Sequence, residues 1–243
     1  MNDAEHFEVF GAAAAALSDA TVSAGRHSFQ RDSERLIPED VAEKLRLEPS
    51  DRLLEIGCGT GNILRPLAAR VGEAVGIDHG ACLEVFSPVP ENVELVPGRW
   101  PQVSLASDFS KVLAYSVLHS LTGAEQAFEF IDRCVAVVRP GGRILLGDLP
   151  NADAGARFAA TDFGQRFLAA WTERVATERS PEDRARDELF AGTPKLERYI
   201  DDAFVAAVFA RYRALGHEVY VLPQLPDLAF SHTREDVLIG VRQ

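Results

Sequence analysis

The sequence lacks any run of 18 or more apolar residues, so it predicts no membrane-spanning helix. Its first residues are acidic, which excludes the Ala12–Ala16 run as the core of a signal peptide. Cysteine is scarce too: Cys58, Cys82 and Cys134 are odd in number and far apart, as expected of reduced thiols. Neither these cysteines nor the six histidines show the spacing of metal ligands, so no metal site is expected. These absences predict a cytoplasmic protein.

Clustered positive charge is also missing. The formal net charge is −12 at pH 7, whereas a nucleic-acid-binding protein needs grouped Lys and Arg to neutralise phosphates. The densest basic stretch, residues 179–186, is interrupted by Glu182 and Asp183, which indicates a solvated helix face with paired charges. The composition therefore argues against nucleic acid as a partner and favours a small-molecule substrate.

The most informative segment is an apolar strand that runs directly into three glycines. Residues 53–61 read Leu-Leu-Glu-Ile-Gly-Cys-Gly-Thr-Gly, and Asp78 ends a second apolar run 21 residues after Gly57. Glycines let a backbone turn sharply and approach a ligand. A carboxylate at the end of the second strand of a βαβ unit can bind a ribose. The chain is therefore predicted to bind a nucleoside-containing cofactor.

The identity of that cofactor depends on residue 62. A dinucleotide fingerprint that starts at Gly57 needs Gly or Ala at this position, where the chain has Asn62. Glu55, two residues before the first glycine, suits a ligand with a positive amino group better than a pyrophosphate. Two alternatives stay open: an NAD(P)-dependent reductase on a Rossmann-like fold, and a non-catalytic regulator that binds a nucleoside.

The segment 55–61 resembles motif I of the class I S-adenosylmethionine (SAM) dependent methyltransferases. This resemblance implies that the chain is an enzyme with SAM as its cofactor, which methylates a small molecule. It also implies that Asp78 accepts both ribose hydroxyls, and that Glu55 either faces the ammonium group or orders the loop. The loop residues that would meet the methionine and ribose portions of SAM are Cys58 and the glycines Gly57, Gly59 and Gly61.

The resemblance extends to the residues that follow the next strands. It implies that His79 lines the adenine side and that Tyr115 and Ser116 contact the donor. After the third strand the family usually has an acid that holds the adenine amino group, but here Gly98 is followed by Arg99 and Trp100. The adenine contact must then come from a backbone carbonyl or from another side chain. The Trp100 ring either closes the pocket or packs against the sheet.

The alternation of predicted strands and helices gives an α/β fold, with a doubly wound, mostly parallel seven-stranded sheet. The strands are predicted at 52–56, 73–77, 93–96, 112–116, 143–147, 218–222 and 236–241. No helical pattern separates the last two, so they should form an antiparallel hairpin. We expect a single domain over 1–243, made of a helical extension (1–50), the SAM-binding core (51–148), an insertion (149–199), and a last helix with the hairpin (200–243).

The insertion is the part that the shared core does not explain. It carries an aromatic face with arginines among the rings, and it leaves from a strand end, where open α/β sheets bind their ligands. A cap over the acceptor pocket, to which the N-terminal helices could contribute, is the preferred interpretation. The alternatives are a helical pair packed on the outside and a contact in a homodimer. The aromatic residues are Phe158, Phe163, Phe167, Leu168 and Trp171, with Arg157, Arg166 and Arg174 among them.

Two residues are candidates for a general base, which a hydroxyl acceptor would need. His119 follows the fourth strand, and histidine titrates closest to neutral pH; a structural histidine is the alternative. Asp148 ends the fifth strand, with helix capping as its alternative role. A sugar or sugar-nucleotide acceptor is one hypothesis, and quinone, polyketide, acidic or phosphorylated acceptors stay open.

Overall fold

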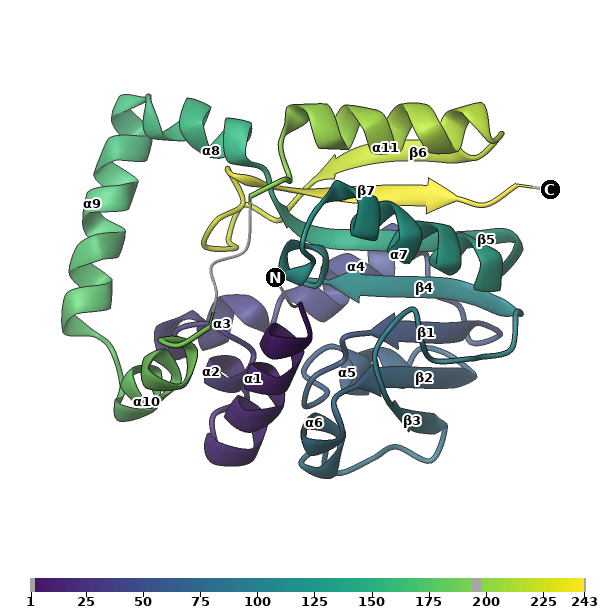
Figure 1. Cartoon of the computed structure of the whole chain (residues 1–243), viewed down its shortest axis with the longest axis horizontal. Coiled ribbons are helices and arrows are strands. Elements are labelled where there is room, and N and C mark those ends of the chain that lie inside the picture. The colour runs from purple at the N-terminus through teal and green to yellow at the C-terminus, as the bar shows by residue number, and fades with distance from the viewer. Residues whose placement is uncertain (1–2, 194–197, 243) are drawn as a thin grey trace.

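A computed structural model describes residues 3–193 and 198–242. In this part of the chain seven strands form one sheet in the order β3-β2-β1-β4-β5-β7-β6 (Figure 1). Only β7 runs antiparallel to its neighbours, β5 and β6. The predicted fold class, including the antiparallel last strand, is therefore confirmed. The strands are β1 (Arg52–Ile56), β2 (Glu73–Asp78), β3 (Val93–Pro97), β4 (Phe109–Tyr115), β5 (Val138–Pro150), β6 (Glu218–Pro223) and β7 (Arg234–Gly240).

Strand β5 is longer than the apolar run predicted. The segment 139–142, expected to be a turn only, belongs to the strand. Its amide groups find partners at the end of the sheet, because Gly141 N donates to Val241 O and Val241 N donates to Gly142 O. Near its other end the pairing with β7 shifts register between Leu146 and Leu149. This irregularity surrounds Asp148, a candidate site residue.

Helices cover both faces of the sheet because the strands are apolar on both sides. On one face, α7 (Ala124–Val137) and α11 (Asp202–Ala214) pack against residues such as Ile56, Ile77 and Ile144. On the other, α4 (Ile37–Leu45) and α5 (Leu64–Ala68) pack against Leu53 and Leu113. The short α6 (Gly80–Glu84) and the 3-10 turn η2 (Leu118–Ser120) follow the carboxyl ends of β2 and β4.

The N-terminal extension and the insertion meet each other beyond the carboxyl edge of the sheet. Besides α4, the extension comprises α1 (Asp3–Ala16), α2 (Ala20–Ser23), the 3-10 turn η1 (Ser28–Gln30) and α3 (Arg31–Glu34). The insertion comprises α8 (Ala152–Ala159), α9 (Asp162–Thr177) and α10 (Pro181–Phe190), which together form an arch from the end of β5 to the N-terminal helices (Figure 1). The division of the chain into one domain with four parts stays a prediction.

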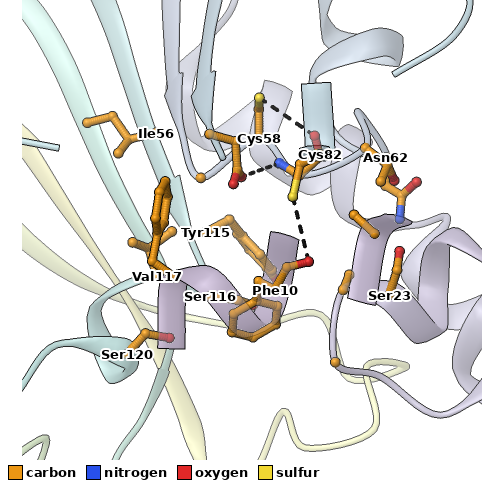
Figure 2. Close-up of a pocket in the computed structure, with 18 of the residues that line it drawn as sticks. Phe10, Ser23, Ile56, Cys58, Asn62, Cys82, Tyr115, Ser116, Val117 and Ser120 are labelled. Atoms are coloured by element: carbon orange, nitrogen blue, oxygen red, sulfur yellow. Dashed lines mark hydrogen bonds between the residues drawn. The ribbon is translucent and has the colours of Figure 1, made fainter. Parts of the chain in front are cut away.

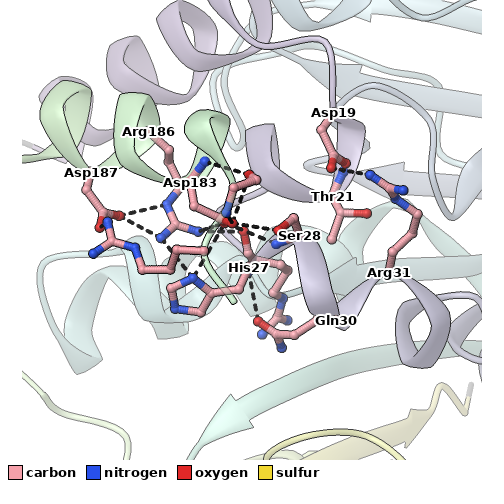
Figure 3. A network of polar contacts seen from close by, with 12 residues as sticks. Asp19, Thr21, His27, Ser28, Gln30, Arg31, Asp183, Arg186 and Asp187 are labelled. Carbon is pink, nitrogen blue, oxygen red and sulfur yellow. Dashed lines mark hydrogen bonds and ion pairs between the residues drawn. The ribbon is translucent and has the colours of Figure 1, made fainter. Parts of the chain in front are cut away.

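A buried carboxylate joins the arch to the extension. Asp183 of α10 is fully buried and accepts hydrogen bonds from the backbone N and the hydroxyl of Ser28, at 3.0 and 2.6 Å (Figure 3). Arg186, one turn along the same helix, donates to the carbonyl of Arg26. Because a buried charge is stable only when it is paired, this network fixes α10 against residues 26–28.

Within the described ranges no helix is long and apolar enough to cross a membrane.

Candidate active site: a pocket at the carboxyl edge of the sheet

A cavity of about 520 Å³ lies at the carboxyl ends of β1, β2 and β4. Residues 55–60 of the glycine loop form one wall, with Ile77 and Asp78 beside them. The 115–117 segment forms a second wall, and Phe10 of α1 and Ser23 of α2 lie across from the loop (Figure 2). Open α/β sheets bind their ligands at this edge, so the cavity is the candidate active site.

The three glycines of the loop have different tasks. All have positive φ, at +77° for Gly57, +54° for Gly59 and +89° for Gly61, which favours glycine. Gly57 and Gly59 line the cavity, and a Cβ on Gly59 would meet nothing within 4 Å. Gly61 is not among the residues that line it; instead, a Cβ there would lie 2.3 Å from the Phe86 ring. The missing side chain of Gly61 thus makes room for Phe86, and a contact of Gly61 with the donor stays a prediction.

This difference predicts the effect of alanine at two glycines. Gly61 and Gly141 have similar φ values, +89° and +82°, but only Gly61 lacks space for a Cβ. We expect Gly61→Ala to lower the free energy of unfolding by about 1–3 kcal/mol more than Gly141→Ala, since overpacking adds to the shared backbone strain. Urea unfolding measures both. Equal losses would show that Phe86 moves aside freely.

Asp78 links the end of β2 to the glycine loop. One carboxylate oxygen accepts a hydrogen bond from Gly59 N and the other from His79 N, each at 2.6 Å. Burial raises the pKa of Asp78, and these two hydrogen bonds oppose the shift. The Cys82 thiol is a third hydrogen-bond partner of this carboxylate. A carboxylate has about four acceptor positions, so at least one is left for a hydroxyl group in the cavity. This arrangement fits a ribose diol.

Glu55 lies under the same loop and is 1% exposed. Its Oε2 atom is buried and has no hydrogen-bond partner among the described residues. Burial, followed by the charge of Asp78, raises the pKa of Glu55 well above its usual value. An unpaired buried acid that lines a cavity fits a ligand with a positive amino group, which would supply the missing partner. Glu55 and Asp78 thus give this wall one carboxylate for the amino group and one for the ribose hydroxyls of an adenosyl amino acid.

His79 is not part of the cavity, contrary to expectation. Its Nδ1 accepts a hydrogen bond from Ala81 N and so caps α6. Its ring lies against α1, edge-on to Phe7, and a Cβ on Gly11 would come within 2.3 Å of it. His79 therefore provides the surface on which α1 packs. Its assignment to the adenine side stays a prediction.

The residues after β3 do line the cavity. Gly98, Arg99 and Trp100 are all in its wall. The Trp100 indole is 4% exposed, donates from Nε1 to the carbonyl of Phe130 at 3.2 Å, and packs edge-on against the Phe130 ring. Trp100 thus packs on α7 and also lines the cavity, and its closure of the donor pocket stays a prediction. Burial lowers the pKa of Arg99.

His119 lines the cavity beyond Tyr115 and Ser116. Its Nδ1 atom is buried and has no hydrogen-bond partner within the described part of the chain. Burial lowers the pKa of His119 to about 4, and the charge of Arg234 adds to the shift. The imidazole is therefore neutral near pH 7 and can accept a hydrogen bond, but its basicity is low for a general base.

Asp148 does not line the cavity and has a different task from the one predicted. It is 3% exposed and forms ion pairs with Arg26 and Arg234, as well as a hydrogen bond with the hydroxyl of Ser116. Burial alone would raise the pKa of Asp148, but the two arginines outweigh it and hold the pKa well below its usual range. A carboxylate held so firmly in its charged form is a poor general base. The structure supports a role as counter-ion instead.

Several cavity residues were missed from the sequence. Arg26, Glu34 and Arg186 line it, together with apolar residues of α1. Gly25, which precedes Arg26 in an otherwise polar stretch, was the one feature of the sequence that indicated a turn there. Among the described residues of the insertion, 149–193 and 198–199, only those of α10 reach the cavity. The aromatic residues of α8 and α9 pack instead against one another and against rings of neighbouring loops: Phe29, Phe230 and His232.

Comparisons with known proteins agree with this geometry. The family described as "Methyltransferase domain" matches residues 53–142. Ubiquinone biosynthesis O-methyltransferase of Rhodopseudomonas palustris (strain HaA2) is 25% identical over 154 residues, which are 61% of this chain and 59% of that protein. A section of chondramide synthase cmdD of Chondromyces crocatus is 24% identical over 204 residues, 78% of this chain and 5% of that protein.

Solved structures show the same fold. Phosphoethanolamine N-methyltransferase 1 of Haemonchus contortus, in complex with phosphoethanolamine and S-adenosylhomocysteine, superposes with a TM-score of 0.69 at 14% identity, over 99% of this chain and 49% of that chain. The SAM-dependent methyltransferase SibL in its apo form gives 0.56 at 17% identity, over 88% and 56% of the two chains. This chain thus spans about half of each of these two structures and 59% of the R. palustris relative.

The sheet order and the solved structures define an α/β protein of the methyltransferase fold, in which the glycine loop and Asp78 lie together at the carboxyl edge of the sheet. Residues 53–142 match the methyltransferase-domain family, and the relatives at 24–27% identity are similar to this chain over half or more of its length.

Proposed function

We propose that this chain transfers a methyl group from SAM to a hydroxyl oxygen of a small molecule. Two features of one cavity wall carry the proposal. Glu55 is buried and has no hydrogen-bond partner among the described residues, and the Asp78 carboxylate beside it can accept hydrogen bonds from a ribose. When bound, SAM supplies a methyl group activated by a positive sulfonium. The similarity to ubiquinone biosynthesis O-methyltransferases favours oxygen as the methylated atom.

The chain's own residues would act mainly by orientation and by the exclusion of water. Glu55 binds the ammonium group, Asp78 the ribose hydroxyls, and the backbone of Gly57 and Gly59 lets the donor lie close to the loop. Phe10 and the N-terminal helices cover the cavity from the other side. Alignment of an attacking oxygen with the transferred methyl can supply a large part of the rate. Loss of the sulfonium charge during transfer suits a partly apolar pocket.

The acceptor belongs on the side of the cavity away from Asp78. Tyr115, Ser116 and His119 line this part, with Arg26 and Arg234 beside them. We assign His119 the task of accepting a hydrogen bond from the acceptor, because its Nδ1 is unpartnered among the described residues. A sugar or sugar-nucleotide is one acceptor class and a phenol is another. The cytoplasmic location and a homodimer stay predictions from the sequence.

Binding and turnover test the proposal together. Isothermal titration calorimetry should detect binding of SAM and S-adenosylhomocysteine and none of NADH. Mass spectrometry should then detect S-adenosylhomocysteine formed from SAM with at least one member of a panel of catechols, hydroxybenzoates and sugar nucleotides. Binding of NADH in place of SAM would support a reductase. Tight SAM binding without turnover on any acceptor would support a non-catalytic regulator.

A further inference from the structure

Two arginines from distant parts of the chain meet at one carboxylate oxygen beside the cavity. Arg26, from the loop after α2, and Arg234, at the start of β7, both donate to Oδ2 of Asp148, the latter at 2.6 Å. The guanidinium groups line the cavity, and their side chains are only 15% and 18% exposed. Charges shielded from water attract an opposite charge more strongly than exposed ones.

Both arginines keep hydrogen-bond donors for a ligand. A guanidinium has five N–H donors in a planar fork. Every hydrogen bond that the structure gives to the Arg26 side chain uses Nη2, which donates to Ser116 Oγ at 2.7 Å and to Asp148. The single one from Arg234 uses Nη1, while its guanidinium carbon lies 5.6 Å from the centre of the Phe230 ring. Most of the donors in the pair are thus not used by the described residues.

The support beneath the two arginines is rigid. The backbone N of Asp148 donates to Asp236 Oδ1 at 2.8 Å, and the Gln224 amide donates to both Asp148 and Asp236. Lys44 forms an ion pair with Asp236, with 2.7 Å between Nζ and Oδ2. Asp148 and Ser116 have φ values of +60° and +59°, a conformation that non-glycine residues seldom adopt and that persists where the surroundings enforce it. Such a framework holds the arginines in place before a ligand arrives.

A second carboxylate lies beside the two arginines, because Glu34 forms an ion pair with Arg26, so the two guanidinium charges face two carboxylates, Asp148 and Glu34. Glu34 lies 3.7 Å from Arg26 Nε, and no hydrogen bond reaches its carboxylate within residues 3–193 and 198–242. His119 is neutral, as argued above. Arg186 and Asp187, which line the far side, pair with each other at 2.6 Å. Asp148 is therefore the one carboxylate hydrogen-bonded to the two guanidinium groups in the described structure.

On the basis of the proposed function, we propose that Arg26 and Arg234 bind an oxyanion of the acceptor, a carboxylate or a phosphate, and so select acidic acceptors. An arginine fork matches these groups through paired hydrogen bonds. Ser116 orders Arg26, and Asp148 positions both arginines without touching the acceptor. Because Arg26 belongs to the N-terminal extension, the site is complete only when that extension covers the cavity. The arginines among the aromatic residues of the insertion have no part in it, since none of them lines the cavity.

Calorimetry with three related probes tests this inference on protein saturated with S-adenosylhomocysteine. The probes are 4-hydroxybenzoate, its neutral counterpart 4-hydroxybenzamide, and 4-hydroxyphenyl phosphate. We expect one or both anions to bind roughly 10- to 100-fold tighter than the amide, as charged hydrogen bonds typically allow. The two anionic probes distinguish a carboxylate site from a phosphate site. Arg234→Gln should abolish the preference, and Arg234→Lys, which keeps the charge but not the fork, should retain part of it.

Arg166→Gln is the matched control, because Arg166 is an exposed arginine of α9 outside the cavity; it should keep the full preference. Equal affinity for the three probes in the unmodified protein, or no binding of any, would overturn the inference. So would an unchanged preference in both Arg234→Gln and Arg26→Gln. Binding of S-adenosylhomocysteine is measured first in every variant. Its absence in the unmodified protein contradicts the proposed function, whereas its presence without anion preference contradicts this inference alone.

Discussion

Asp78→Asn is expected to weaken the binding of S-adenosylhomocysteine by roughly 10- to 100-fold, because hydrogen bonds to a charged group are worth about 1.5–3 kcal/mol. In the structure Gly59 N and His79 N each donate to one carboxylate oxygen of Asp78, and Asp78 lines the cavity. An amide replaces one of these acceptors by a donor, which cannot pair with the backbone N–H that faces it. Calorimetry measures the loss directly.

Asp32→Asn is the control for this variant, since the Asp32 side chain is 93% exposed and lies outside the cavity. It should bind S-adenosylhomocysteine like the unmodified protein. Thermal unfolding of both variants separates a lost contact from a disordered loop. A folded Asp78→Asn variant with unchanged affinity would contradict the assignment of the ribose to Asp78.

Asp148→Asn is expected to lower the free energy of unfolding by about 3–5 kcal/mol. The change removes the charge to which two half-buried arginines are paired, and an uncompensated buried charge is costly. Urea unfolding at pH 7 measures this effect. Asp108→Asn, which removes an exposed partner of Arg52, is the matched control and should cost at most about 1 kcal/mol.

The same pair of variants has a defined pH dependence. Because the pKa of Asp148 is lower in the folded than in the unfolded protein, its stabilising effect is present above the unfolded pKa and is lost as pH falls. The difference between the unmodified protein and Asp148→Asn should therefore shrink below about pH 4, the ordinary range of an aspartate. A constant difference from pH 7 to pH 3 would show that the ion pairs do not set the stability of this site.

The fold was largely predictable because its signals are local. The apolar run before the glycines gave β1 with its observed bounds, and the missing helical pattern after β6 predicted the antiparallel β7. The glycine loop and Asp78 were found for the same reason: strand, turn and carboxylate follow one another within a single βαβ unit. The main error in the strands was at 139–142, where pairing with residues a hundred positions away extended β5.

The acceptor side was not predictable in the same way, because long-range contacts build it. Arg26 and Asp148 are 122 residues apart, and no local pattern marks them as partners. From the sequence alone, Asp148 at the end of a strand was a candidate general base. Its ion pairs with Arg26 and Arg234 favour a role as counter-ion instead. The packing of α1 on His79 was equally unpredictable, because it depends on the absence of a side chain at Gly11, 68 residues away.

A crystal structure with S-adenosylhomocysteine tests the central claim most directly. The account predicts the ribose hydroxyls on Asp78, the amino group at Glu55, and the sulfur facing the side of the cavity that holds Tyr115 and Ser116. A compound bound elsewhere, or a cavity that stays vacant at saturating concentration while NADH occupies it, would contradict the account.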